Sequence, residues 1–221
     1  MSRATGIEIG AEASPKRTFV WALEWPGWCR SGKDLELAMA SLDAYAERYR
    51  EVAEVAGLPL PDDSAGELRV VEAVAGGGRT EFGVPSAITA SDRRPTTAHE
   101  GERIAALVEA AWIVFDRVSA SASPELRKGP RGGGRDRDKL IGHVIEADHA
   151  YAREIGVRSP APSLDDRSTV DAERAAVLDV LRQPSDGAPL ADRKWTQRYA
   201  ARRIAWHALD HAWEMEDRTE R

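Results

Sequence analysis

The fold is decided by the stretch Arg198-Tyr-Ala-Ala-Arg-Arg-Ile-Ala-Trp-His-Ala-Leu-Asp-His-Ala-Trp-Glu-Met-Glu-Asp-Arg218. It carries His207 and His211 four residues apart, a spacing that places two side chains on one face of a helix. The same face holds three apolar residues: Ile204, Ala208 and Met215. The pattern therefore predicts a helix whose two imidazoles point into a core.

A third histidine on another predicted helix would complete a metal site. His143 lies in the stretch Lys139-Leu-Ile-Gly-His-Val-Ile-Glu-Ala-Asp148, on the apolar side of that helix. Facing helices of a bundle bring such side chains to one point. Three protein ligands leave positions for water and substrate, as in catalytic zinc sites.

We therefore predict that His143, His207 and His211 bind a divalent metal. Three imidazoles suit zinc, the expected ion, with nickel, iron, manganese or copper as alternatives. The competing interpretation is that each histidine is a core or boundary residue that binds no metal. The stretch from His207 to His211 has alanine where the His-Glu-x-x-His motif has its general base, so a metallopeptidase is not predicted.

Carboxylates one helical turn away are candidates to orient these histidines or to act as acid or base. Asp210 and Glu214 follow His207 and His211 by three residues, and Glu146 follows His143 by three. Ligating histidines usually donate their second N–H to such a group. The alternative is that these acidic residues are solvated, with Asp210 pointing outward because it directly precedes His211.

An arginine- and glycine-rich loop, residues 127–139, leads into the helix that carries His143. Arg131 and Arg135, together with the helix N-terminus, are candidates to bind a carboxylate or phosphate near the metal. The loop lacks the Gly-Lys-[Ser/Thr] of a P-loop. The alternative is a flexible charged loop.

The other potentially reactive residues are assigned no chemistry. His149 lies six residues after His143, on a different helix face, and His99 falls in a first helical turn, so both are expected to be solvated. The chain has one cysteine, Cys29, which excludes an intrachain disulfide and a thiolate metal cluster. We expect Cys29 to be a packing residue at a strand end, away from the helical half.

Composition limits the class of protein. The chain has 221 residues, 42% hydrophobic and 31% charged, with a formal net charge of -6. A negative net charge disfavours nonspecific nucleic-acid binding, which depends on cationic residues. The sequence has no apolar run near the roughly 20 residues of a membrane span and no signal-peptide core at its start. We therefore expect a cytoplasmic protein that binds neither nucleic acid nor membrane.

Residues 1–86 are predicted to form a small β-β-α-β-β domain. The run Arg17–Trp25 alternates well, with Phe19 and Trp21 on one face. Gly76-Gly77-Gly78 is typical of a hairpin loop. The expected elements are strands at 6–14 and 17–25, a helix at 35–52, and strands at 67–74 and 79–84. Residues 87–97 are predicted to be a linker.

Residues 98–221 are predicted to be helical. Thr97 and Glu100 form a capping box, followed by an apolar stripe at helical spacing that ends near Val118. Further helices are expected at 137–155, 168–183 and 198–218. Four amphipathic helices joined by short to medium loops predict an antiparallel four-helix bundle. The expected fold class is α+β.

Residues 98–218 resemble the DinB superfamily of bacterial four-helix proteins, which includes YfiT-like hydrolases and thiol S-transferases. The resemblance rests on Leu140-Ile-Gly-His143-Val and on His207-Ala-Leu-Asp-His211. It implies a divalent metal held by those three histidines. It also implies transfer of a low-molecular-weight thiol such as mycothiol to an electrophile on a small-molecule substrate.

Residues 6–56 resemble the HicB-like module, on the stretch from Trp25-Pro-Gly-Trp-Cys-Arg to Leu42. In HicB antitoxins this module binds a small toxin, but the chain has no evident DNA-binding segment. The module is expected to cover the helical half or to mediate a homodimer. Three functions stay open: a thiol transferase, a metal-dependent hydrolase, and a non-catalytic binding protein.

Overall fold

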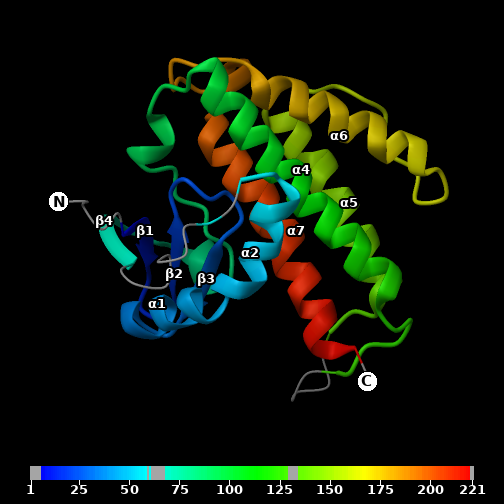
Figure 1. Ribbon diagram of the computed structural model, residues 1–221, viewed down its shortest axis with the longest axis horizontal. Helices are drawn as coiled ribbons and strands as arrows, with labels where there is room; N and C mark the ends of the chain where they lie inside the picture. Colours follow the sequence, from blue (N-terminus) through cyan, green and yellow to red (C-terminus); the bar gives the residue numbers. More distant parts are fainter. Residues whose placement is uncertain (1–5, 59, 61–67, 129–133, 220–221) are drawn as a thin grey trace.

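The computed structural model describes residues 6–58, 60, 68–128 and 134–219. The described chain is α+β, with one four-stranded mixed sheet and seven α-helices (Figure 1). The elements are β1 (Ile7–Ala13), β2 (Thr18–Ala22), β3 (Cys29–Gly32), α1 (Leu35–Ala44), α2 (Ala46–Val55), β4 (Leu68–Ala75), α3 (Gly78–Glu81), η1 (Ser91–Arg93), α4 (Ala98–Ser121), α5 (Arg137–Glu154), α6 (Arg167–Arg182), η2 (Leu190–Asp192) and α7 (Gln197–Arg218).

The sheet has the strand order β3-β2-β1-β4. β2 pairs with β1 and β3 in antiparallel fashion, whereas β4 pairs with β1 in parallel. The predicted strands at 6–14, 17–25 and 67–74 therefore correspond to β1, β2 and β4. β3 was not predicted, because Cys-Arg-Ser-Gly is short and does not alternate. It becomes a strand where the chain turns back at Gly27, whose φ is +96°.

The strand predicted at 79–84 is wrong: this segment begins with the short helix α3. Gly77 caps that helix, so the expected hairpin loop is a helix start. The Thr80 hydroxyl accepts a hydrogen bond from the Gly77 backbone N–H at 2.9 Å and donates to the Glu12 carboxylate at 2.5 Å. The bond to Gly77 caps the short helix, and the bond to Glu12 ties it to strand β1, so the segment does not join the sheet.

The helix predicted at 35–52 is divided in two at Tyr45. The Tyr45 backbone has φ -98° and ψ 5°, and its N–H bonds to the Leu42 carbonyl rather than continuing the α-helical pattern. The Tyr45 ring lies 5.1 Å from the Trp213 ring and 3.9 Å below the Arg30 guanidinium. This tertiary packing accounts for the break, which the apolar spacing alone does not reveal.

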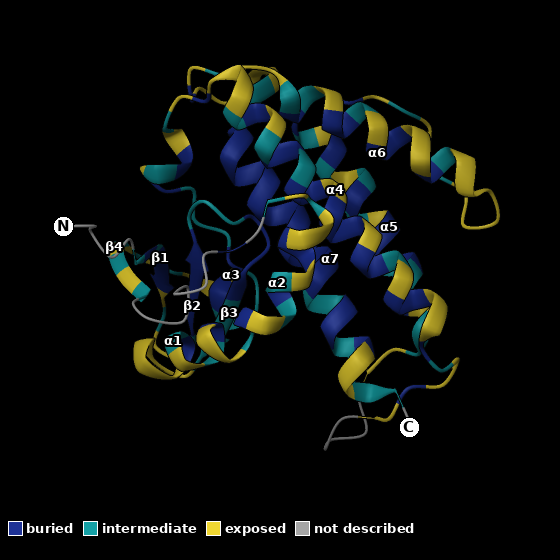
Figure 2. Cartoon of the chain, in the orientation of Figure 1, coloured by how far each residue is buried: buried dark blue, intermediate teal, exposed yellow. Residues whose placement is uncertain are grey.

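The four long helices of the second half lie at the predicted positions. α4 begins at the Thr97–Glu100 capping box, as predicted. α4 packs against α7, α6 and α2, and α5 packs against α7 and α6. α7 runs through the middle of the molecule and is almost entirely buried over its first three turns (Figure 2). No helix in the described ranges is long and apolar enough to cross a membrane.

One hydrophobic core runs through both halves of the chain. It extends from Ile7 in β1 to Met215 in α7 without a break between the sheet and the helices. The opposite face of β2 also packs on α7: Phe19 meets the Trp206 ring edge-on at 6.0 Å, and Arg202 lies 4.3 Å above Trp21. Alternate residues of a strand point to opposite faces, so β2 is buried on both sides. α7 therefore belongs to the core of both halves.

Gly10 is required where the Trp21 indole crosses β1. The two residues are paired in the sheet, and a Cβ on Gly10 would lie 2.5 Å from the indole. We expect Gly10→Ala to lower the free energy of unfolding by about 1–3 kcal/mol, as overpacked substitutions do. Urea unfolding measures the change. Gly78→Ala is the matched control, because no atom lies within 4 Å of that Cβ; equal losses would contradict the assignment.

Candidate metal centre

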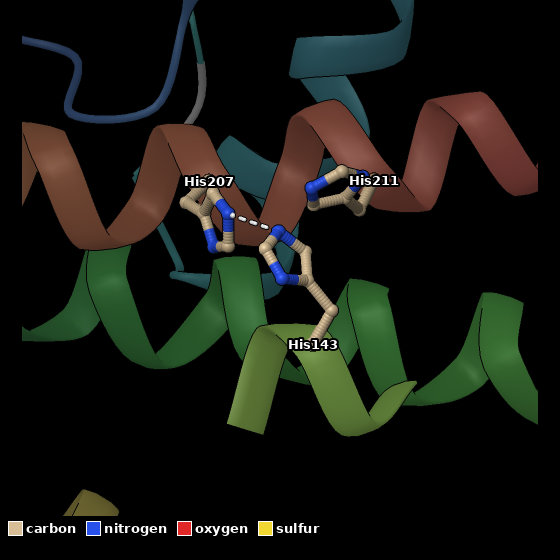
Figure 3. A group of neighbouring side chains, drawn as sticks. All are labelled: His143, His207 and His211. Atoms are coloured by element: carbon tan, nitrogen blue, oxygen red, sulfur yellow. Dashed lines mark hydrogen bonds between the residues drawn. The ribbon is translucent and has the colours of Figure 1, made fainter. Parts of the chain in front are cut away.

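Two helices bring the three predicted histidines together. His143 projects from α5, and His207 and His211 project from α7 (Figure 3). One ring nitrogen of each lies within 4.8 Å of the other two. The Nε2 atoms of His143 and His207 are 3.3 Å apart, and the ring of His211 lies 4.8 Å from that of His207. The three imidazoles thus face a common point.

This spacing fits a small divalent ion. Two nitrogens about 2.05 Å from zinc at the tetrahedral angle are about 3.3 Å apart. The separation of the His143 and His207 nitrogens matches that value, and the nitrogen of His211 lies within 4.8 Å of the other two. Within the described residues, the buried Nδ1 of His207 has no hydrogen-bond partner. The nitrogen that faces His143 is Nε2, so the unpartnered Nδ1 lies on the other side of the ring from the proposed ion.

The electrostatics of the site favour neutral imidazoles. Burial lowers the pKa of His207 well below its ordinary value, and the neighbouring His211 lowers it further. Burial and His211 also lower the pKa of His143. Both rings are therefore unprotonated at neutral pH, the form that binds metal ions.

Of the three predicted carboxylates, Glu214 contacts a histidine. Its carboxylate lies 2.9 Å from Nδ1 of His211 and also bonds to Arg218. The hydrogen bond with His211 is the main reason that the pKa of Glu214 is lowered. Because Nδ1 is engaged, His211 is left to offer Nε2 to an ion.

Asp210 and Glu146 do not take the predicted positions. Asp210 bonds to Arg30 of β3 at 2.9 Å, because one residue along a helix turns the side chain about 100° away from His211. Glu146 is exposed, and no hydrogen bond to its side chain occurs in the part of the chain that the structure describes. Asp210 thus points away from the histidines, but it pairs with Arg30 rather than with solvent.

Part of the predicted anion-binding loop lies outside the described residues, and the positive charge of Arg135 contributes to lowering the pKa of both His143 and His207. Arg131 lies outside the described residues. The side chain of Arg135 is exposed, and its backbone carbonyl accepts a hydrogen bond from Arg218 at 3.0 Å. That bond links the loop to the helix of Glu214, but through the backbone of Arg135 and not through its guanidinium.

Sequence reasoning assigned no role to two residues beside the histidines, Tyr151 and Arg203. The Tyr151 ring lies 5.6 Å from the His207 ring, and its hydroxyl accepts a hydrogen bond from Arg203 at 3.0 Å. A signal was present: Arg203 precedes His207 by four residues, and Tyr151 follows His143 by eight. Each therefore continues the line of a histidine along its own helix.

The structure also places the three residues to which no chemistry was assigned, which are His99, His149 and Cys29. His99 is exposed, as predicted, but His149 is not solvated: its Nδ1 lies 2.6 Å from the buried carboxylate of Glu173 on α6. Cys29 is a buried packing residue as predicted, but it lies against Trp206 of α7 and not away from the helices. Burial raises the pKa of the Cys29 thiol to about 12, so it is not a thiolate nucleophile at neutral pH.

Comparison with known proteins adds no assignment. No protein-family model matches the chain, and neither a curated protein nor a solved structure matches it.

Proposed function

We propose that the protein is a metal-dependent enzyme that transfers a low-molecular-weight thiol to an electrophile at the His143, His207 and His211 cluster. The observation that carries the proposal is the convergence of three imidazoles from two helices, with two nitrogens 3.3 Å apart. Three protein ligands leave open coordination positions, which is typical of catalytic rather than structural sites. Zinc is the proposed ion, with nickel, iron or manganese as alternatives.

A bound divalent ion would lower the pKa of a thiol or of water at the open position. The residues of the chain would hold and orient the ion. His143 and His207 present neutral rings to it, and Glu214 fixes the ring of His211. In the transfer, the thiol would release its proton to solvent and its sulfur would bond to an electrophilic carbon. The leaving group departs with the electron pair of the broken bond.

Two alternative functions differ from the thiol transferase: one uses a different nucleophile, and the other carries out no reaction. In a metal-dependent hydrolase, water takes the place of the thiol and its oxygen bonds to the substrate. In a non-catalytic binding protein, the cluster is a vestige and the N-terminal module binds a partner. The open arrangement of the histidines favours an enzyme over a vestigial site.

The resemblances of the sequence extend the proposal to architecture. We propose that α4, α5, α6 and α7 form an antiparallel four-helix bundle of the DinB type. The N-terminal sheet with α1 and α2 is the HicB-like module, and the continuous core supports its role as a cover on the bundle. An enzyme that uses a reduced thiol works in the cytoplasm, where thiols are kept reduced. A homodimer is the proposed assembly.

Metal analysis of untagged protein tests the proposal. We expect about one divalent ion per chain, either on purification or after incubation with zinc or nickel. The loaded protein is then incubated with mycothiol and electrophilic acceptors, and loss of free thiol is followed. If the chain acquires no metal, the proposed metal-dependent enzyme is refuted. A chain that binds metal and cleaves esters or amides without consuming thiol is the hydrolase.

Glu214 and Asp210 provide a matched pair of substitutions on α7. We expect Glu214→Gln to weaken metal binding by about 10–100-fold, because a carboxylate that orients a ligating histidine is worth that much. Asp210→Asn should leave metal affinity unchanged, since Asp210 bonds to Arg30. Competition with a chromophoric chelator measures both affinities. Equal losses in the two variants would show that charge near the site matters and orientation does not.

A further inference from the structure

Arg203 differs from the other buried arginines in its partners. Arg174, Arg198, Arg202 and Arg203 are all buried, with at most 9% of each residue exposed. Three of them pair with carboxylates: Arg174 with Asp116 at 2.7 Å, Arg198 with Glu100 at 3.0 Å and Arg202 with Asp92 at 2.7 Å. Within the described ranges of the chain, no carboxylate lies at ion-pair distance from Arg203.

The contacts of Arg203 are with neutral groups. Its guanidinium donates to the Tyr151 hydroxyl at 3.0 Å and to the Pro85 carbonyl at 3.5 Å. It also lies 5.3 Å from the centre of the Tyr151 ring and 4.7 Å from that of Trp206. Aromatic faces stabilise a buried cation, but they do not neutralise it as a carboxylate does. The site therefore holds a buried positive charge without an anion.

This charge lies beside the histidine cluster. Arg203 is one helical turn before His207 on α7, and the Tyr151 ring packs edge-on against His207 at 5.6 Å. A substrate held at the histidines would thus extend toward the Arg203–Tyr151 pair. The Tyr151 hydroxyl already accepts from Arg203 and still has its own proton to donate.

We propose that Arg203 and Tyr151 bind the carboxylate of an anionic thiol or acceptor held at the three-histidine site. The assignment rests on the proposed function for the position of the reacting group. The planar guanidinium presents parallel N–H groups that match a carboxylate, and the phenol supplies one further donor. The two parallel N–H groups of the guanidinium match the two oxygens of a carboxylate. The substrate class is therefore a small carboxylic acid.

The proposed role of Arg203 and Tyr151 is tested with two thiols that differ only in charge. Protein loaded with cobalt is titrated with 3-mercaptopropionate and with 3-mercaptopropanamide, and sulfur-to-cobalt absorption reports binding without turnover. We expect wild type to prefer the carboxylate by about tenfold or more, the worth of one charge-assisted hydrogen bond. Arg203→Gln should abolish the preference while metal content and amide affinity stay as in wild type. Equal binding of the two thiols by wild type overturns the proposal.

Further variants keep the test decisive if Arg203→Gln does not fold. Arg203→Lys keeps the positive charge but loses the two parallel N–H groups of the guanidinium, so we expect a reduced preference for the carboxylate thiol. Tyr151→Phe should also reduce it, whereas Arg153→Gln, an exposed arginine on α5, should not. A full preference in both Arg203→Lys and Tyr151→Phe overturns the assignment.

Failure of the proposed function has a different signature. If the chain binds no metal, metal-free wild type and Arg203→Gln are titrated with propionate and propionamide by calorimetry. Binding of propionate by wild type that is lost in Arg203→Gln supports the carboxylate site although the enzyme is refuted. Absence of propionate binding by wild type overturns both.

Discussion

Replacing His207 with alanine is expected to weaken metal binding by more than about 100-fold while the helices stay intact. Groups that merely orient a ligand are worth about 10–100-fold, and loss of a ligand costs more. His207 is the most buried of the three histidines, and its Nε2 lies 3.3 Å from that of His143. Alanine is the best helix former, so the circular dichroism of α7 should not change. Metal per chain after dialysis, measured by mass spectrometry, gives the result.

The control for this substitution is His99→Ala. His99 is exposed in the first turn of α4, so its loss should leave the metal content unchanged. His143→Ala and His211→Ala should behave as His207→Ala does, because the three rings would bind the same proposed ion. Full metal content in His207→Ala would refute the site, whereas loss in His99→Ala as well would point to scattered surface binding.

Asp92→Asn is expected to lower the free energy of unfolding by about 3–5 kcal/mol, the cost of breaking a buried ion pair from one side. Both oxygens of Asp92 accept hydrogen bonds from Arg202 at 2.7 Å, and both residues are buried. Asparagine has the same shape but leaves the guanidinium of Arg202 without a counter-charge. A typical domain is stable by only about 5–15 kcal/mol, so the shift in the urea midpoint should be large.

An exposed ion pair provides the comparison for Asp92. Lys16 and Glu81 pair at 2.9 Å, but the Lys16 side chain is 76% exposed. Glu81→Gln should therefore change the free energy of unfolding by less than about 1 kcal/mol. If Asp92→Asn cost no more than Glu81→Gln, the pair that joins η1 to α7 would not stabilise the fold.

Local signals were sufficient for the long helices. The Thr97–Glu100 capping box marks the start of α4, and the apolar spacing that follows is too long for a strand. The four-residue spacing of His207 and His211 also predicted their common face. Such features are visible because they depend on residues within one or two helical turns of each other.

Features that depend on distant partners were not predictable. Thr80 bonds to Glu12, which is 68 residues away, and that contact makes a helix start from a strand-like stretch. Asp210 accepts a hydrogen bond from Arg30, which is 180 residues away. His149 likewise forms a hydrogen bond with Glu173 on α6, a residue on another helix. Periodicity gives the face on which a side chain lies, but not the group that it meets there.

The central place of α7 sets the order in which the protein can fold during synthesis. Ribosomes make the sheet and α4, α5 and α6 before α7, at about 5–20 residues per second. Until α7 emerges, Phe19 and Trp21 have no helix to cover them. The nascent chain therefore leaves these two aromatic side chains without their cover until α7 has been made. Two of the three histidines, His207 and His211, lie on this same last helix, so the cluster and the aromatic cover are completed together.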